Sequence, residues 1–412
     1  MSGGNFIESA GVSVAGIWGS ASGSLSASAP SGRESSYAFS SGSAGPFYRT
    51  PNLGGSYASL YAGFAFYPGS LPSGNAIVVA FLDASANSQC DLRVNPTGLF
   101  FFTRNGTVIG STSTYALIPA AWSYVEFKAI FSTTGTGTCE VRINGVVILT
   151  ATSVTNATTT ATAAVTQFNI GGTGFTGTSY CTDFYVVDGG SGSNTSYLGD
   201  VQVVEVYPNG AGVNSAWTAN VGPFTLTSVN TTGVYQGTIT GGASNAYVGY
   251  NFNVTGFTNG ANNVTGAVCT ASTATALTLT ATTISETHAG SAAFQAITQA
   301  GINGTGTRPN GDVTYVSSNV TSQKIDYAHQ AFTTPGSILG VVHQSYMRKD
   351  DAGTRIVAQL CISTGTTEQS SNISLGGSYV YYQDILENDP HTGSAWTASG
   401  FNAATFGSII VA

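Results

Sequence analysis

The stretches Tyr124–Phe131, YVEFKAIF, and Cys139–Leu149, CEVRINGVVIL, decide the fold of this chain. In both stretches apolar residues occupy every second position and polar or charged residues lie between them. Alternation with a period of two is typical of a β-strand that buries one face and exposes the other. The second stretch is interrupted by Asn144-Gly145, a dipeptide that favours a tight β-hairpin. The sequence therefore predicts antiparallel strands joined by short turns.

The composition extends this prediction to the whole chain. Only 7% of the 412 residues are charged, whereas an ordinary soluble domain has about 25%. Apolar residues make up 42%, with 21 Phe and 20 Tyr, which excludes a disordered chain. Helical periodicity is nearly absent, so we expect an all-β protein.

Charge and cysteine usage limit the partners and the compartment. The net charge is −8 and the 11 basic residues are scattered, which argues against nucleic-acid binding, because that needs clustered Lys and Arg. No apolar run is long enough for membrane insertion. The N-terminal residues lack the pattern of a secretory signal, and the five cysteines form no CxxC pair. We therefore expect reduced thiols and synthesis in a reducing cytosol.

Three sections follow from the spacing of strands and turns. The first covers residues 1–212 and begins with a Ser/Gly/Ala-rich lead-in through residue 46. The second covers 223–293 and has Glu286 as its one charged residue. The third covers 294–412.

An internal repeat connects two distant parts of the chain. The pentapeptide SAWTA occurs at Ser215–Ala219 and again at Ser394–Ala398. We interpret it as a sign that residues 213–222 belong with 294–412, and that 223–293 is an insertion in a surface loop. Chance repetition in a chain of low complexity is the alternative.

The sequence offers no catalytic motif. The four histidines are far apart, and no serine has the glycines of a nucleophile elbow. A β-sandwich glycosidase needs two carboxylates that face one groove; Glu-x-Glu does not occur, and Glu-x-Asp occurs once, at Glu387-Asn388-Asp389. Glu126 and Glu140 each precede a basic residue by two positions, Lys128 and Arg142, which favours cross-strand ion pairs on a solvated face. We therefore expect no enzymatic activity, no catalytic residue and no cofactor-binding residue.

Three acids in a loop-rich stretch, Asp183, Asp188 and Asp200, are candidates for a Ca²⁺ site, because Ca²⁺ is bound by carboxylate and carbonyl oxygens. No other cofactor is expected.

A second candidate is an interaction patch in the third section. It consists of the charged run Arg348, Lys349, Asp350 and Asp351 and the aromatic residues Tyr379, Tyr381 and Tyr382. The charged run is also compatible with a solvated hairpin tip. The tyrosines are suited to stacking on sugars or to packing across a subunit interface.

Longer strings of the sequence resemble structural proteins of tailed bacteriophages. In the first section these are WSYVEFKAIF and SYCTDFYVVDGGSGSNTSYLGDVQVVEVYPNG, and in the third DVTYVSSNVTSQKIDYAHQAF and ENDPHTGSAWTASGFNAATFGSIIVA. The resemblance covers most of residues 30–222 and 306–412. In the middle, NFNVTGFTNGANNVTG resembles a small Ig-like β-module that occurs as an insert in phage proteins.

The resemblance implies both a fold and a role. The fold is a concanavalin A-like, laminin G-type jelly roll over 1–212, then a second β-sandwich, 294–412 with 213–222, that carries the Ig-like module at 223–293. The role is a non-enzymatic virion protein on the particle exterior, in head decoration or a tail fibre. It is assembled in the host cytoplasm with other virion proteins as a symmetric homo-oligomer, with a trimer favoured. The alternative role is a tail adhesin that binds host cell-surface glycan.

Overall fold

The computed structural model is almost entirely β, with antiparallel sheets throughout, which confirms the predicted fold class. The residues that it describes are 6–8, 20–21, 24–26, 30, 33, 38–40, 47–158, 160–169, 175, 177–190, 192–221, 224–240, 242, 245, 247–294, 314–333 and 336–412. Most of the expected lead-in, residues 1–46, lies outside this set. No helix in the described part of the chain is long and apolar enough to cross a membrane.

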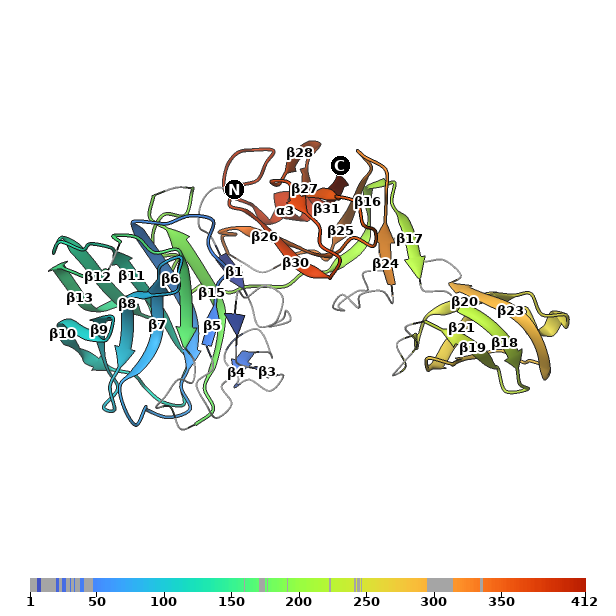
Figure 1. The fold of residues 1–412 in the computed structure, drawn as a ribbon, viewed down its shortest axis with the longest axis horizontal. Helices are drawn as coiled ribbons and strands as arrows, with labels where there is room; N and C mark the ends of the chain where they lie inside the picture. The colour runs from blue at the N-terminus through green and yellow to red at the C-terminus, as the bar shows by residue number, and fades with distance from the viewer. Residues whose placement is uncertain are drawn as a thin grey trace. The chain divides into compact units, whose positions relative to one another are not determined.

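The N-terminal part forms a jelly roll of two sheets (Figure 1). The first sheet contains, in spatial order, β13 (Val146–Val154), β12 (Gly137–Ile143), β11 (Ser123–Ile130), β6 (Ser59–Tyr67), β15 (Tyr180–Asp188), β4 (Ala38–Ser40) and β3 (Ser24–Ser26), and β1 (Phe6–Glu8) also pairs with β15. The second sheet contains β10 (Thr107–Ala116), β9 (Leu99–Arg104), β8 (Ser88–Val94), β7 (Ala76–Leu82), β14 (Val165–Asn169), β5 (Phe47–Arg49) and β2 (Ser20–Ala21).

The alternation seen in the sequence sets the register of these strands. Phe127 of β11 lies opposite Val141 of β12, and both side chains are fully buried in the core between the sheets. Asn144 and Gly145 have φ values of 50° and 79°, as a type I′ hairpin turn between β12 and β13 requires. Because side chains alternate with a period of two, the pairing that buries Phe127 directs its neighbours to the outer face of the sheet.

The chain divides into two compact units. The first comprises Met1–Glu205, Pro335–Gln344 and Tyr381–Ala398, and the second comprises Val206–Thr334, Ser345–Val380 and Ser399–Ala412. The sequence placed the first boundary at residue 212 and kept 294–412 together, so the division found here differs at both places. The difference arises because Pro335–Gln344 and Tyr381–Ala398, both from the third section, belong to the jelly-roll unit. The local sequence pattern does not reveal such long-range contacts.

The second unit contains a six-stranded sheet. Its strands are, in order, β16 (Pro208–Ser215), β25 (Lys324–His329), β31 (Thr405–Ile410), β27 (Ile356–Ser363) and β28 (Thr366–Gln369), with β29 (Ile373–Ser374) also paired to β27. β17 (Thr218–Val221) pairs with β24 (Thr314–Ser317), and β26 (Val341–Met347) pairs with β30 (Val380–Leu386). Residues on both sides of the central section thus share one sheet, because β16 pairs with β25. The short helix α3 (Ala398–Ala403) precedes β31.

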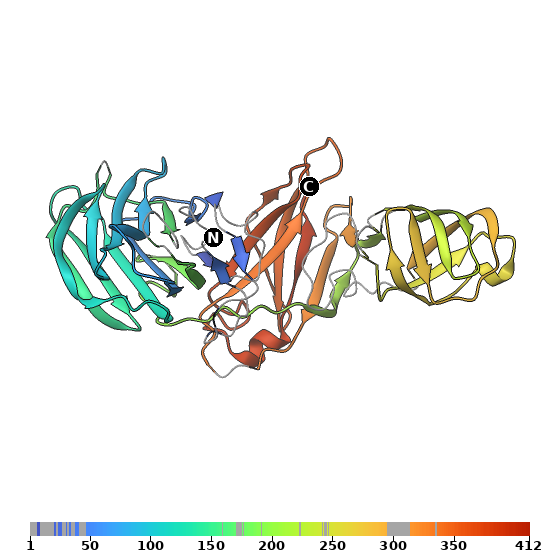
Figure 2. The same ribbon diagram turned by 90° about the horizontal axis from the view of Figure 1, so that it is seen from below.

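The central section forms a closed barrel (Figures 1 and 2). Its strands are, in order, β18 (Phe224–Val229), β19 (Val234–Ile239), β22 (Ala276–Leu279), β21 (Ala267–Ser272), β20 (Asn251–Thr255) and β23 (Glu286–Phe294), which closes on β18. The resemblance implied a small Ig-like β-module here. Closure arises because β23 pairs with both β18 and β20, a long-range pairing that periodicity does not reveal.

We expect the barrel to fold alone, because it pairs every strand internally and has its own apolar core. Residues 224–294, produced as a fragment, should unfold cooperatively in a denaturant titration. Leu277→Ala should lower the free energy of unfolding by about 2–5 kcal/mol, because it leaves a cavity at a fully buried position. Val248→Ala, at a half-exposed position, is the control and should change it by less than about 0.5 kcal/mol. A fragment without a cooperative transition would contradict this expectation.

Candidate functional site

Two of the three predicted calcium ligands are bound to an arginine. The guanidinium of Arg33 contacts Asp183 at 2.8 Å and Asp200 at 2.7 Å, and it also donates to the carbonyl of Val201 at 2.9 Å. It lies 5.5 Å from the ring centre of Tyr124. Arg33 therefore supplies the positive charge between the two carboxylates that the sequence analysis assigned to Ca²⁺.

The third predicted ligand has a different role. Asp188 accepts a hydrogen bond from the backbone N–H of Gly190 at 2.7 Å, as in a local turn. Among the described residues, no group of three or more His, Cys, Asp or Glu side chains is arranged to hold a metal ion.

The environment of Asp183 explains why Arg33 is needed. The side chain lies in an irregular part of β15, at a φ of 55°, and only 6% of it is exposed. Burial raises the pKa of Asp183, whereas the N–H of Val203 and the charge of Arg33 oppose that rise. The ion pair therefore keeps a buried carboxylate charged inside the first unit.

Glu126 corrects one expectation from the sequence. It was expected on a solvated face beside Lys128, but it is 1% exposed. Its Oε1 accepts hydrogen bonds from the hydroxyl of Tyr185 at 2.6 Å and from the N–H of Gly199 at 2.9 Å. Leu198, next to Gly199, packs on the same outer face of the sheet as Tyr185, which is why the carboxylate is covered.

A cluster of rings and charges occupies another part of this outer face. Arg142 stacks over Tyr197 at 4.0 Å and forms an ion pair with Glu140 at 2.8 Å. Tyr61 meets Tyr197 edge to face at 5.0 Å, and Lys128 lies over Tyr61 at 5.4 Å. All five side chains are partly exposed. The sequence predicted a cross-strand ion pair, whereas Arg142 pairs with Glu140 on its own strand. It also missed the two tyrosines, which come from segments far away in the chain.

The second unit brings part of the predicted interaction patch together. The rings of Tyr346 and Tyr379 stack at 4.8 Å with an angle of 16° between their planes. The guanidinium of Arg348 lies 5.1 Å from the ring centre of Tyr379. All three side chains are partly exposed. We call these three residues the aromatic platform. Sequence reasoning missed Tyr346, although its spacing of two from Arg348 placed both residues on one face of a strand.

The charged run has a local structural role. Lys349 bonds through its backbone N–H to the carbonyl of Gly376 at 2.8 Å and through its ammonium to the carbonyl of Gly353. Asp351 forms an exposed ion pair with Arg355 at 2.5 Å. Asp350 is exposed. These contacts are those of a hairpin tip, the alternative that the sequence left open.

The remaining two tyrosines differ from Tyr379. Tyr381 belongs to the first unit, where it packs against the apolar core of the jelly roll. Tyr382 is partly buried, and burial raises its pKa. Tyr381 and Tyr382 thus belong to the first unit, whereas the other residues of the predicted patch belong to the second.

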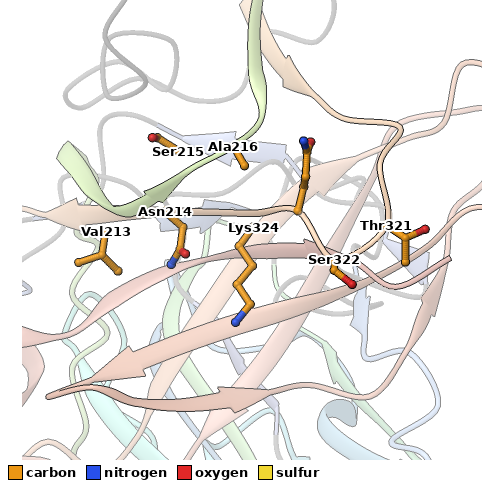
Figure 3. A pocket seen from close by; sticks show the side chains of 8 residues that line it. Val213, Asn214, Ser215, Ala216, Thr321, Ser322 and Lys324 are labelled. Atoms are coloured by element: carbon orange, nitrogen blue, oxygen red, sulfur yellow. The ribbon is translucent and has the colours of Figure 1, made fainter.

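A hollow of about 480 Å³ lies between the end of β16 and the start of β25 (Figure 3). Its described lining is uncharged apart from Lys324. Buried Asp326 accepts hydrogen bonds from the N–H groups of Val213 and Asn214 at 3.0 and 2.7 Å, where the register of β16 shifts. The hollow is suited to a small polar or anionic group beside one ammonium.

Solved structures that resemble this chain do so at low sequence identity and low TM-score. No family model matches the chain, and no curated protein matches it. An endo-β-1,4-glucuronan lyase from the fungus Trichoderma reesei is 11% identical, with a TM-score of 0.34 over 44% of this chain and 94% of that one. The alginate lyase vAL-1 from Chlorella virus is 11% identical, with a TM-score of 0.29 over 40% of this chain and 88% of that one. A mutant sialidase of Trypanosoma rangeli is 9% identical, with a TM-score of 0.29 over 40% of this chain and 27% of that one.

These neighbours correct the expectation that the chain is not an enzyme. That expectation relied on the lack of a recognisable catalytic motif, whereas the similar solved structures are polysaccharide lyases and a sialidase.

The Arg33 ion pair yields a testable prediction. Arg33→Met should lower the free energy of unfolding of the first unit by about 3–5 kcal/mol at pH 7, because it leaves the buried carboxylate of Asp183 without its partner. The pKa of Asp183 is raised by burial, and losing Arg33 raises it further. As the pH falls towards that raised pKa the folded protein binds a proton at Asp183, so the loss should shrink between pH 7 and pH 5.

Denaturant unfolding at both pH values measures this effect. The control is Arg355→Met, which removes an exposed ion pair and should cost no more than about 1 kcal/mol. Equal losses for the two variants would show that Arg33 has no special role.

Proposed function

We propose that this chain is an exterior component of a tailed-bacteriophage particle that recognises carbohydrate on the host surface. The observation that supports carbohydrate recognition is the aromatic platform of Tyr346, Tyr379 and Arg348. Its support is physical: stacked rings offer an apolar face for the C–H groups of a sugar ring, and a guanidinium offers several donors for hydroxyl or carboxylate oxygens.

The platform favours a ligand that has both an apolar ring face and oxygen acceptors. The ring stack is stiff, because each tyrosine has only two side-chain torsions to fix on binding. The guanidinium already lies over one ring, so a ligand meets donors and an aromatic face together.

The virion part of the proposal relies on the sequence resemblance described above. An uncharged surface rich in Ser, Thr, Asn and Gly suits a protein that works outside cells, and a repeated particle favours a symmetric oligomer such as a trimer.

Glycan binding is tested on the isolated full-length chain with polysaccharide extracted from host cells. Tyr346→Ala and Tyr379→Ala should each weaken binding tenfold or more, about 1.4 kcal/mol, because each removes half of the stack. The matched control is Tyr250→Ala, a partly exposed tyrosine of the barrel, which should leave binding unchanged. Unchanged binding in both platform variants would refute the site.

The virion assignment is tested by the copy number of this chain in purified phage particles, measured by quantitative mass spectrometry against the major capsid protein. A small multiple of three is expected for a trimeric tail or fibre component. A number close to that of the capsid protein would instead indicate head decoration, and absence from particles would exclude the virion role.

A further inference from the structure

The core of the jelly roll contains two cysteines that face each other across the sheets. Cys90 is on β8 of the second sheet and Cys139 is on β12 of the first. Their sulfur atoms are 3.2 Å apart, and neither residue is exposed. All five cysteines of the chain are thiols in this structure.

We propose that Cys90 and Cys139 are a modification site, at which oxidation forms a disulfide that joins the two sheets of the jelly roll. A disulfide has an S–S length of about 2.05 Å, so the two sulfurs need to approach by about 1.1 Å. The proposal goes beyond the proposed function and does not depend on it, because both residues belong to the first unit alone.

A neighbouring side chain holds one of the two sulfurs in place. Nδ2 of Asn156 donates to Sγ of Cys139 at 3.3 Å and to the carbonyl of Ile130 at 2.8 Å, and Oδ1 of Asn156 accepts from the N–H of Ser132 at 2.8 Å. Asn156 is fully buried and held by these bonds. Cys139 is thus held where its sulfur meets that of Cys90.

The oxidant is a small-molecule disulfide such as glutathione disulfide. One of the two cysteines, as its thiolate, attacks one sulfur of the oxidant, forms a mixed disulfide and releases one glutathione thiolate, which takes up a proton. The other cysteine loses its proton and attacks the protein sulfur of the mixed disulfide, which expels the second glutathione as a thiolate that takes up a proton. Two protein thiols are oxidised to one disulfide, and one glutathione disulfide is reduced to two glutathione molecules.

Burial determines when the reaction takes place. Desolvation raises the pKa of Cys90 well above its ordinary value, so its thiolate is scarce at neutral pH. The oxidant also needs room that the closed core does not have. Cross-linking therefore proceeds while the two sheets are apart, during folding or during opening of the jelly roll, and a reducing cytosol keeps the pair as thiols.

The test uses the full-length chain, unfolded in guanidinium under reducing conditions and refolded either with glutathione disulfide and glutathione or with dithiothreitol. A parallel sample of native protein is incubated with glutathione disulfide at pH 8.5. After denaturation, thiols are alkylated and counted, and cross-linked peptides are identified by mass spectrometry. We expect three free thiols after oxidation, one cross-linked peptide pair containing Cys90 and Cys139, and a thermal midpoint higher by on the order of 5–10 °C that dithiothreitol reverses.

Two variants complete the test. Cys139→Ala should lose both the cross-link and the rise of the midpoint, whereas Cys181→Ala, a buried cysteine of the same core, should keep both. If Cys139→Ala does not fold, the thiol count of the unmodified chain decides alone. Five free thiols in oxidised protein with a native circular dichroism spectrum, or a cross-link between other cysteines, would overturn the proposal.

Discussion

Contact between the apolar faces of two sheets is the constraint on which the jelly roll depends. Phe81 of one sheet stacks on Phe127 of the other with ring centres 4.8 Å apart, and Phe102 stacks on Phe127 at 5.7 Å. Large buried rings contribute more than exposed ion pairs, each worth about 0–1 kcal/mol. A chain with 7% charged residues therefore has to obtain its stability from this burial. The strand register, and with it the position of every outward-facing side chain, follows from keeping these rings inside.

The few acids that are buried in this protein need hydrogen-bond donors. Glu126, Asp183 and Asp326 are nearly inaccessible to solvent, and each carboxylate receives hydrogen bonds from backbone N–H groups, a hydroxyl, an amide or Arg33. A buried charge without such donors would cost several kcal/mol. These acids therefore hold irregular segments against regular strands, as Asp326 does at the shifted part of β16. Their role is to position backbone.

The sequence predicted what local periodicity determines. The strands at 124–131 and 139–149 and the hairpin at Asn144-Gly145 follow from alternation and turn chemistry, and the structure confirms them. It did not predict which acids are buried, because Glu126 is covered by a segment that follows it by about 70 residues. For the same reason the partners of Arg33, the ring stack of Tyr346 with Tyr379 and the closure of the barrel were not visible. Each depends on contacts between distant segments, which no pattern within a strand encodes.

The two proposed properties of this protein are physically separable. The aromatic platform is built from residues of the second unit, whereas the cysteine pair lies in the core of the first. A disulfide between two sheets that already face each other changes no outward-facing side chain, since the sulfurs are fully buried. It acts on the unfolded state, by shortening the free chain between β8 and β12, more than on the folded surface. A protein assembled among thiols and released into an oxidising medium would thereby gain resistance to unfolding while its recognition surface stays the same.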